Sequence, residues 1–499
     1  METIHSATPL FAQLTSLIGA FLVLFTGEKR PNLRETWTII ASVVKFVLLF
    51  SIISHVIDGN IIEFTLVEVC KGVSLQFRID AFGAIFALLA SFLWIVVSIY
   101  SIGYMRGLKE HAQTRFYFCF ALAIFSATGI AMAGNLLTLY MFYEILTVAT
   151  FLLVAHKETP DAIKSGRKYL TYLLSGAALV LFSMGMTYHL TGTLDFIPGG
   201  FIGGHGSNAL LSLVFVLFII GFGTKAAIMP FHEWLPSAMV APTPVSALLH
   251  AVAVVKAGVF CCLRIILYVY GPDLLTDLGL WTILAIFVSI TVIVANFFAL
   301  TQDHLKRRLA FSTINNLSLI ILGAALISSD GIKGAMLHIP FHGFMKITLF
   351  MCAGAILVKT HKENISEIDG IGRQMPITMA AFTIGAAGLT GLPPVCGLIS
   401  KWYLCLGALQ ANAIIFLCVF LLSAILDAAY FFPIVYSAFF KKAANDIKSH
   451  FDEAPIFAVT AIVITAVFSV LLFLFPDLIF NFYSIVGLAV ESIVSGGGL

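Results

Sequence analysis

The stretch that decides the fold is "GFGTKAAIMPFHEWLPSAMVAPTP", residues 221–244. It places Lys225 near the end of about twenty apolar residues, the length that crosses the ~30 Å hydrocarbon core of a bilayer. Prolines follow at positions 230, 236, 242 and 244. Because proline removes a backbone donor and breaks a helix, this combination predicts a membrane helix that is interrupted beside a buried charge.

The whole chain has the composition of a polytopic membrane protein. Hydrophobic residues make up 60% of the 499 positions, charged residues make up only 11%, and the mean hydropathy is +1.01. A water-soluble domain of this composition would expose large apolar patches. The net charge of +2, without a basic face, argues against a nucleic-acid partner. The eight cysteines show no CxxC spacing, so neither a metal cluster nor a disulfide framework is predicted.

The apolar runs divide into fourteen segments of membrane-spanning length. The predicted fold class is therefore an all-α polytopic membrane protein of about 14 transmembrane helices. The predicted spans are 7–26, 36–57, 78–104, 113–133, 135–155, 168–190, 208–230, 244–270, 277–300, 308–328, 333–358, 376–408, 411–440 and 455–480.

The basic residues predict how the chain is oriented. Nearly all Lys and Arg residues of the connections follow odd-numbered spans, whereas the opposite side holds only Lys71, Arg78 and Lys333. Short cytoplasmic loops carry such a positive excess. We therefore expect a multi-pass protein of the prokaryotic inner (cytoplasmic) membrane, with both termini on the non-cytoplasmic side.

A second interruption, "GLTGLPPVCGLISKW" at residues 388–402, lies inside a predicted span and resembles the first. Paired broken helices in two halves of a chain indicate an internal repeat with the transport site between the halves. The alternative is two unrelated packing kinks. The predicted organisation is three N-terminal helices in residues 1–112, a first repeat in 113–270, a second repeat in 271–440 and one C-terminal helix in 441–499.

Ionisable residues near the centres of several predicted spans are the candidate functional residues. A charge at the bilayer centre costs at least ~2.5 kcal/mol, so such residues usually mark a pathway or a paired interior site. Burial disfavours the ammonium form of a lysine that has no carboxylate partner, so the lysines can exchange protons. The alternative for a lone intramembrane charge is a structural ion pair between helices. The candidates are Glu144, Lys225, His250, Lys256, His338, His342, Lys346 and Lys401, with Asp427 as an additional candidate.

The predicted eleventh span carries a regular row of titratable groups. His338, His342 and Lys346 repeat every four residues, so they lie on one helix face with a rise of ~6 Å per step. This row is typical of a proton wire. Two histidines at this spacing could instead bind a haem or a metal, but a facing pair of ligands is missing, and we predict no metal site.

Residues around the first interruption are further candidates. His232 is a candidate proton-entrance group, although the "HEWLP" stretch also fits an interface turn, and Lys168 is a further additional candidate. Thr243 and Ser246 could coordinate Na⁺, or could simply belong to a tight helix restart. We expect Arg264, near the end of its span, to extend to the membrane surface.

Three stretches carry a resemblance to a known family: "GFGTKAAIMPFHEWLPSAMVAPTPVSALLHAVAVVKAG" (221–258), "LHIPFHGFMKITLF" (337–350) and "LTGLPPVCGLISKWYL" (389–404). The chain resembles the antiporter-like subunits shared by respiratory complex I, membrane-bound hydrogenases and Mrp-type multisubunit cation/proton antiporters. The resemblance implies fourteen helices, two inverted five-helix repeats, and broken helices 7 and 12.

The resemblance also implies roles for individual residues. Glu144 matches the helix 5 glutamate and Lys225 the helix 7 lysine that pairs with it. Lys256 matches the connecting lysine of helix 8, and Lys401 the helix 12 lysine at the exit half-channel. His250 matches a helix 8 histidine of many relatives, and the helix 11 row is found in part of the family. Asp427 stands where relatives more often have an uncharged polar residue.

The function implied by this resemblance is proton translocation within a multisubunit membrane complex. The first hypothesis is the D-type subunit of an Mrp-type Na⁺/proton antiporter, because the chain ends soon after the last predicted span. The alternative is a pump subunit of a complex I-like NADH:quinone oxidoreductase or a membrane-bound hydrogenase, and a weaker one is a scaffold that does not transport. No flavin or nicotinamide fingerprint is present, so we expect no cofactor, and any redox chemistry would belong to partner subunits.

Overall fold

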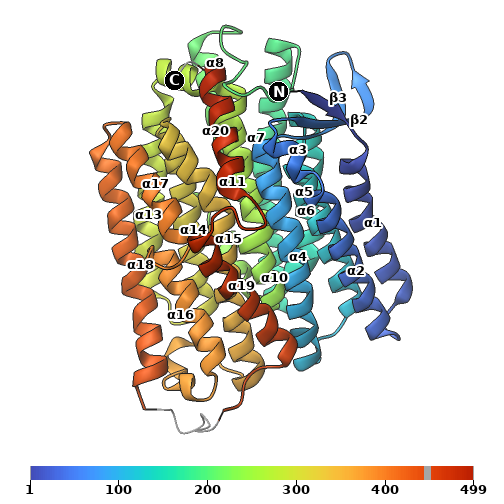
Figure 1. The fold of residues 1–499 in the computed structure, drawn as a ribbon, viewed down its shortest axis with the longest axis vertical. Helices are drawn as coiled ribbons and strands as arrows, with labels where there is room; N and C mark the ends of the chain where they lie inside the picture. Colours follow the sequence, from blue (N-terminus) through green and yellow to red (C-terminus); the bar gives the residue numbers. More distant parts are fainter. Residues whose placement is uncertain (1, 443–450, 498–499) are drawn as a thin grey trace.

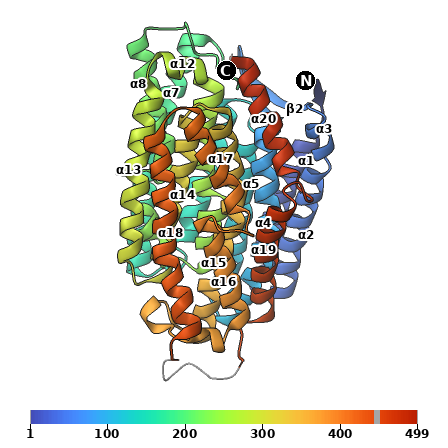
Figure 2. The ribbon, with the colours of Figure 1, turned by 60° about the vertical axis from the view of Figure 1, so that its left-hand side comes forward.

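The computed structural model describes residues 2–442 and 451–497 and shows a bundle of long helices that run side by side (Figures 1 and 2). Thirteen helical segments of the described chain are long and apolar enough to cross a membrane. The predicted span 376–408 is the fourteenth, and it consists of two shorter helices. The predicted helical membrane fold is therefore confirmed. The long helices are α1 (Thr8–Thr26), α2 (Pro31–Phe50), α4 (Ala81–Gly107), α5 (Gln113–Ala131), α6 (Leu136–Val154), α7 (Pro160–Thr191), α8 (Asn208–Lys225), α13 (Leu280–Thr301), α14 (Leu305–Ala325), α15 (Ser329–Thr360), α18 (Ile414–Phe440) and α19 (Ile456–Leu474).

A small sheet at one end of the bundle was not predicted. Strand β1 (Thr3–His5) pairs in parallel with β2 (Ile61–Cys70), which pairs in antiparallel fashion with β3 (Val73–Ile79). The β2–β3 hairpin turns at Gly72, whose φ of +78° lies in the left-handed region that glycine adopts without strain. Short helix α3 (Ile53–Ile57) leads from α2 into the sheet. Hydropathy windows of span length do not register such short strands outside the helical bundle.

The C-terminal region holds a second helix beyond the one predicted. After α19 the chain turns and forms α20 (Phe482–Gly497), which is too short to count as a full span. The end of α20 and strand β1 lie at the same end of the bundle (Figure 1). The two ends of the described chain therefore lie at one end of the bundle.

The first interruption falls directly after Lys225. Helix α8 ends there, Ala227 adopts a φ of +59°, and the chain continues through the short helices α9 (Trp234–Ser237) and η1 (Ala238–Val240). The predicted span to residue 230 therefore ends five residues early. The freed backbone is held by local contacts, such as the hydrogen bond from Trp234 Nε1 to the carbonyl oxygen of Thr224 at 2.8 Å.

The second interruption divides the predicted span 376–408. Helix α16 (Pro376–Thr390) ends at Gly391, whose φ is +87°, and α17 (Gly397–Gln410) starts after two consecutive prolines. Lys401 lies in the first turns of α17, close to the break. Both intramembrane breaks that the prolines predicted are therefore present, and each stands beside one of the central lysines.

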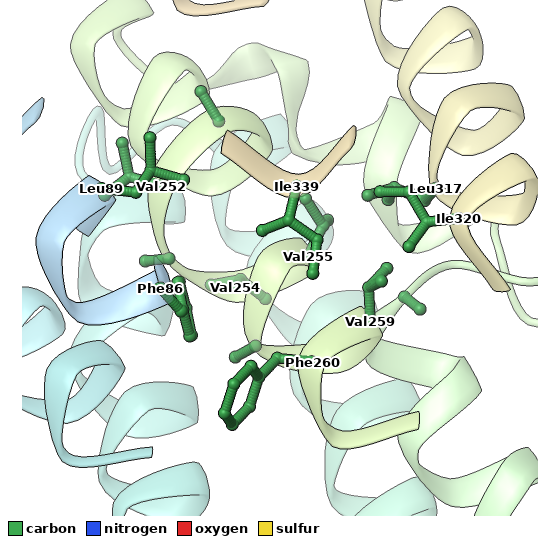
Figure 3. Packing of buried hydrophobic residues seen from close by; sticks show 14 of the residues in the cluster. Phe86, Leu89, Val252, Val254, Val255, Val259, Phe260, Leu317, Ile320 and Ile339 are labelled. Atoms are coloured by element: carbon green, nitrogen blue, oxygen red, sulfur yellow. The ribbon is translucent and has the colours of Figure 1, made fainter. Parts of the chain in front are cut away.

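The segment after the first interruption is the most buried part of the molecule. It runs through α10 (Thr243–Ala247), the π-helical η2 (Leu248–Val252), α11 (Val254–Arg264) and the π-helical η3 (Ile265–Tyr270), and then α12 (Pro272–Asp277). Figure 3 shows its side chains between two groups of helices: Val252 near Leu89 of α4, and Val255 near Ile339 of α15. Short π-helical turns inside α-helices occur mostly at functional sites, and His250 lies in one of them.

Candidate functional site

Lys225 is completely buried at the C-terminal end of α8, and α6 holds its ammonium group. The Nζ donates hydrogen bonds to the carbonyl oxygen of Tyr143 at 2.7 Å and to Thr147 Oγ1 at 3.0 Å. It also lies 3.2 Å from the centre of the Tyr143 ring, within the range of a cation–π interaction. These contacts stabilise a cation in a place where water is excluded.

Glu144 follows Tyr143 on α6 but makes no direct contact with the Lys225 ammonium group. The described residues contain no ion pair between the two side chains within 4.0 Å, and Glu144 Oε1 is buried without a hydrogen-bond partner. Glu144 itself is only half-buried. The structure therefore brings the predicted pair onto adjacent helices with their charges apart.

Lys256, His342 and His338 form a connected row at the centre of the molecule. Lys256 Nζ on α11 lies 2.8 Å from His342 Nδ1 on α15, and the rings of His342 and His338 are 5.7 Å apart. All three side chains have no exposed surface. Two members of the predicted row on α15, His338 and His342, thus lie side by side, and Lys256 of the neighbouring helix contacts His342.

His338 extends this row to the helix that carries Lys401. Its Nδ1 lies 2.8 Å from Ser400 Oγ, and its Nε2 lies 3.1 Å from Asn316 Oδ1. Because both ring nitrogens already have partners, the pair of histidines does not offer two free facing nitrogens to a haem or metal. Ser400 directly precedes Lys401 in α17.

Lys401 ends the row in an ion pair with Asp427. Its Nζ lies 2.8 Å from Asp427 Oδ2 and also donates to the carbonyl oxygen of Leu389, the residue two positions before the break. The other carboxylate oxygen, Oδ1, accepts hydrogen bonds from Asn315 Nδ2 at 3.0 Å and from the hydroxyl of Tyr430. Asp427, whose place in the sequence left its role open, is the direct partner of Lys401.

Three of the buried candidate residues have nitrogen atoms without a hydrogen-bond partner: His342 at Nε2, His250 and Lys346. Neither ring nitrogen of His250 has a hydrogen-bond partner, and its ring lies 4.6 Å from that of Phe350. Lys346 Nζ is likewise unpartnered, with the Phe431 ring 5.7 Å away. A buried polar atom without a partner costs about 1–3 kcal/mol, so these positions are where water or an altered conformation would be stabilised.

Two glycines allow the helices of the site to approach closely. A Cβ atom on Gly258 of α11 would lie 2.7 Å from the carbonyl carbon of Lys225, and one on Gly334 of α15 would lie 2.6 Å from the amide nitrogen of Leu404. Both distances are shorter than real Cβ contacts. The glycines therefore set the spacing between α11 and the end of α8, and between α15 and α17.

The two additional candidates near the first break lie at the surface, apart from the row. Lys168 of α7 forms an ion pair with Glu233 at 2.5 Å, and Glu233 is 59% exposed. His232 Nδ1 has no partner, and its ring stacks near Phe298 at 6.5 Å. Burial lowers the pKa of His232. Among the described residues, no hydrogen bond or ion pair links Lys168 or His232 to the central histidines.

The prediction that Arg264 extends to the membrane surface is wrong. Its side chain is 1% exposed, and its guanidinium makes two hydrogen bonds to Asp80, at 2.6 and 2.7 Å. The Tyr268 ring lies 4.3 Å from its guanidinium carbon. The Asp80 carboxylate, at the start of α4, neutralises the guanidinium inside the protein, so the side chain does not have to reach water. This partner could not be identified from the sequence, because it lies 184 residues away.

The two candidate Na⁺ ligands, Thr243 and Ser246, differ in their surroundings. Thr243 Oγ1 donates to the hydroxyl of Tyr104 at 3.4 Å, whereas Ser246 Oγ is buried without a partner. Sequence reasoning missed the uncharged members of the site, because isolated amides and hydroxyls are common in apolar helices. The adjacent pair Asn315 and Asn316, in the middle of a predicted span, was the signal that could have pointed to them.

Residues 133–426 match the family model described as "NADH:quinone oxidoreductase/Mrp antiporter, TM". Residues 71–117 match the model described as "NADH-Ubiquinone oxidoreductase (complex I), chain 5 N-terminus". The first match covers more than half of the chain and includes every residue of the buried row from Lys256 to Lys401.

Three curated relatives come from different kinds of complex. NADH-quinone oxidoreductase subunit N of Desulforudis audaxviator is 32% identical over 372 residues, which are 74% of this chain and 73% of that protein. Hydrogenase-4 component B of Escherichia coli is 32% identical over 66% of this chain, and the chain covers 50% of that protein. The A-type component of the Na(+)/H(+) antiporter of Alkalihalophilus pseudofirmus is 29% identical over 99% of this chain, and the chain covers 63% of it.

Two solved structures share the fold over nearly the whole chain. One is the membrane-bound sulfane sulfur reductase, described as an archaeal respiratory membrane complex, with a TM-score of 0.87, 23% identity and 98% of both chains covered. The other is the Mrp complex from Dietzia sp. DQ12-45-1b, with a TM-score of 0.85, 18% identity and 98% of this chain and 99% of that chain covered. The chain belongs to the NADH:quinone oxidoreductase/Mrp antiporter family of membrane subunits.

Proposed function

We propose that this protein is a proton-translocating subunit of a multisubunit membrane complex. The observation that carries the proposal is the buried row from Lys256 through His342 and His338 to Ser400, next to the Lys401–Asp427 pair. Lys256 with His342, and His338 with Ser400, lie within hydrogen-bond distance, and the rings of His342 and His338 are 5.7 Å apart. Imidazole and hydroxyl groups can both give and accept a proton or a hydrogen bond. Buried ionisable side chains stabilise a fold no better than apolar side chains of similar volume, because removing them from water costs free energy.

The proposed switch lies at the other end of the site, at Glu144 and Lys225. When the Glu144 carboxylate and the Lys225 ammonium group are close, the pair favours the protonated lysine. When they separate, the lysine loses the stabilisation of the carboxylate, and burial favours release of its proton toward the centre. The helix break after Lys225 provides the freedom that such a movement requires. The remaining gap to Lys256 is proposed to be bridged by water near His250.

The proposed assembly is an Mrp-type Na⁺/proton antiporter in which the chain has the role of the D-type subunit. The match of almost the full chain length to an A-type antiporter component supports an antiporter. The alternative, a pump subunit of a redox-driven complex, is supported by the matches to a component of NADH-quinone oxidoreductase and to a hydrogenase component. In both assemblies, the proposed role of the chain is to transfer protons.

The proposed partners are other membrane subunits, and α6 offers a surface for one. Met141, Ile145, Val148 and Leu152 of α6 are between 36% and 58% exposed and form a stripe beside Glu144. A neighbouring protein on this stripe would control how far Glu144 is hydrated. The proposed location is a prokaryotic cytoplasmic membrane, with both termini on the non-cytoplasmic side.

The experiment is a flux measurement on the complex reconstituted in liposomes. Proton movement is followed with a pH-sensitive dye after an imposed Na⁺ gradient, and separately after an imposed membrane potential. Glu144→Gln and Lys225→Ala are each expected to lower proton flux at least tenfold, whereas Asp277→Asn, at an exposed site, should leave it unchanged. Wild-type flux in both site variants would overturn the proposed switch. Flux that follows the potential but not the Na⁺ gradient would favour the redox-driven assembly.

A further inference from the structure

A second cluster of titratable groups lies outside the proton row, where two connections between helices meet. Glu110 and His111 belong to the connection between α4 and α5, and His156 follows the end of α6. One ligand atom from each of the three side chains lies within 4.8 Å of the other two. Glu110 and His111 are about 45 positions from His156 in the sequence, so no sequence motif indicates that the three residues lie together.

His156 is the buried member of the cluster, and its ring nitrogens, Nδ1 and Nε2, have no hydrogen-bond partner. Its side chain has no exposed surface. Buried imidazoles are almost always hydrogen-bonded, because leaving both nitrogens empty forfeits the free energy of their hydration. Both ring nitrogens of His156 are therefore free to bind a ligand that enters the cluster.

The other two members can move toward His156. The His111 ring already stacks on it, with 5.0 Å between ring centroids, and His111 is exposed. Glu110 is partly exposed, and its carboxylate has no ion-pair partner among the described residues. The nearby Arg115 is paired with Glu158 and donates to the carbonyl oxygen of His156 at 3.0 Å.

We propose that Glu110, His111 and His156 form a binding site for a divalent transition-metal ion of the Zn²⁺ class. Two imidazoles and a carboxylate are the donor set that Zn²⁺ accepts with water as a fourth ligand. Bonds of about 2.0–2.2 Å place tetrahedral ligand atoms roughly 3.3 Å apart, so the site closes with side-chain rotation of its two exposed members. A bound ion would fix the α4–α5 connection to the end of α6, the helix that carries Glu144.

The site is tested by metal titration of the protein purified in detergent with any subunits that accompany it, after chelator treatment. Co²⁺ serves as the spectroscopic probe, because four-coordinate Co²⁺ absorbs visible light far more strongly than hydrated Co²⁺. The wild type is expected to bind one equivalent more than His156→Gln. His111→Gln and Glu110→Gln, at sites with solvent access, are expected to weaken binding at least tenfold. His205→Gln, which removes an exposed histidine elsewhere, is the control.

Zn²⁺ provides a second readout that does not depend on transport. An ion that binds only the folded state raises the apparent melting temperature. The increase is expected in the wild type and in His205→Gln, and is expected to vanish in His111→Gln, which leaves the buried His156 in place. Equal Co²⁺ stoichiometry and affinity in the wild type and in all three site variants would overturn the proposal, as would an equal Zn²⁺ effect on melting in His111→Gln.

Discussion

Asp427 and Lys401 show how single residues keep a charge at membrane depth. The carboxylate accepts hydrogen bonds from the ammonium group, from Asn315 and from Tyr430, so most of its acceptor capacity is used. The Lys225 ammonium group has no carboxylate partner and is instead stabilised by a carbonyl oxygen, a hydroxyl group and the face of an aromatic ring. One central lysine thus has a full counter-charge and the other has only dipoles, so the two differ in how easily they lose a proton.

This difference predicts the effect of Asp427→Asn. The substitution leaves the Lys401 ammonium group buried without a counter-charge, and breaking a buried pair in this way typically costs about 3–5 kcal/mol. We expect a lower apparent melting temperature in detergent and at least a tenfold loss of proton flux in liposomes. The double variant Lys401→Met with Asp427→Asn should regain stability but not flux. If the double variant transported protons at the wild-type rate, the pair would be only structural.

At the scale of elements, the breaks and the close contacts between helices place these residues. Helix α8 ends at Lys225 and α17 begins just before Lys401, so each lysine stands where backbone groups are also free. The buried segment α10–α11 connects the two regions, and Gly258 allows it to lie directly against the end of α8. Helix packing therefore decides whether Lys225 and Lys256 can exchange a proton at all.

Gly258→Ala tests this close contact. The added methyl group would lie 2.7 Å from the carbonyl carbon of Lys225 and 2.9 Å from Ala226 Cα, and overpacking of this kind typically costs about 1–3 kcal/mol. We expect a lower melting temperature and reduced proton flux. Gly185→Ala in α7 is the matched control, because a Cβ there meets nothing within 4 Å. Alanine in that helix should leave flux unchanged and should not lower stability. Equal melting temperatures for the two variants would contradict the argument.

The Asp80–Arg264 pair joins α4 to the end of α11 and gives a prediction about pH. Burial tends to raise the pKa of Asp80, but Arg264 and the Gly83 amide outweigh it, so its pKa is lowered overall. A carboxyl group with a lowered pKa in the folded state stabilises the protein above its ordinary pKa, and this stability is lost as the pH falls through the folded value. The wild type should therefore lose thermal stability as the pH falls below ~4.

Asp80→Asn removes that dependence by removing the charge. It should also lower the melting temperature at neutral pH, because the buried Arg264 is left without its carboxylate. Asp58→Asn, at an exposed position, is the control. Melting temperatures are measured in detergent from about pH 3 to about pH 8, a range that spans the ordinary carboxyl pKa. A variant as stable as the wild type at neutral pH would show that the ion pair contributes little to holding α4 against α11.

At the scale of the whole molecule, the sequence predicted the helices better than their connections to one another. Hydropathy located the spans and the prolines located both breaks, because the bilayer imposes one length and one hydrogen-bonding requirement on every helix. The rarity of charges at membrane depth also identified the charged members of the buried row. The partners of Arg264 and Lys401, and the neighbours of His156, could not be predicted, because each comes from a distant segment and depends on how the helices pack. The sheet and α20 were missed because both are shorter than a span.

The orientation of the whole molecule gives the last prediction. Exposed Cys70 lies at the end of β2, in the hairpin at the same end of the bundle as strand β1 (Figure 1). Lys29 is exposed between α1 and α2, at the opposite end, because α1 crosses the bundle between them. The distribution of basic residues predicts that the Cys70 end faces away from the cytoplasm.

Cys418 is also exposed, so the test starts from a Cys418→Ser variant. A membrane-impermeant maleimide applied to spheroplasts should label this variant, and adding Cys70→Ser should abolish that labelling. In the Cys70→Ser, Cys418→Ser background, Lys29→Cys should be labelled only in inverted vesicles or after the membrane is permeabilised. The remaining cysteines of the described chain are buried or half-buried, so each reaction reports on one end of the bundle. The reverse pattern, with Lys29→Cys labelled from outside and Cys70 protected, would place the termini in the cytoplasm.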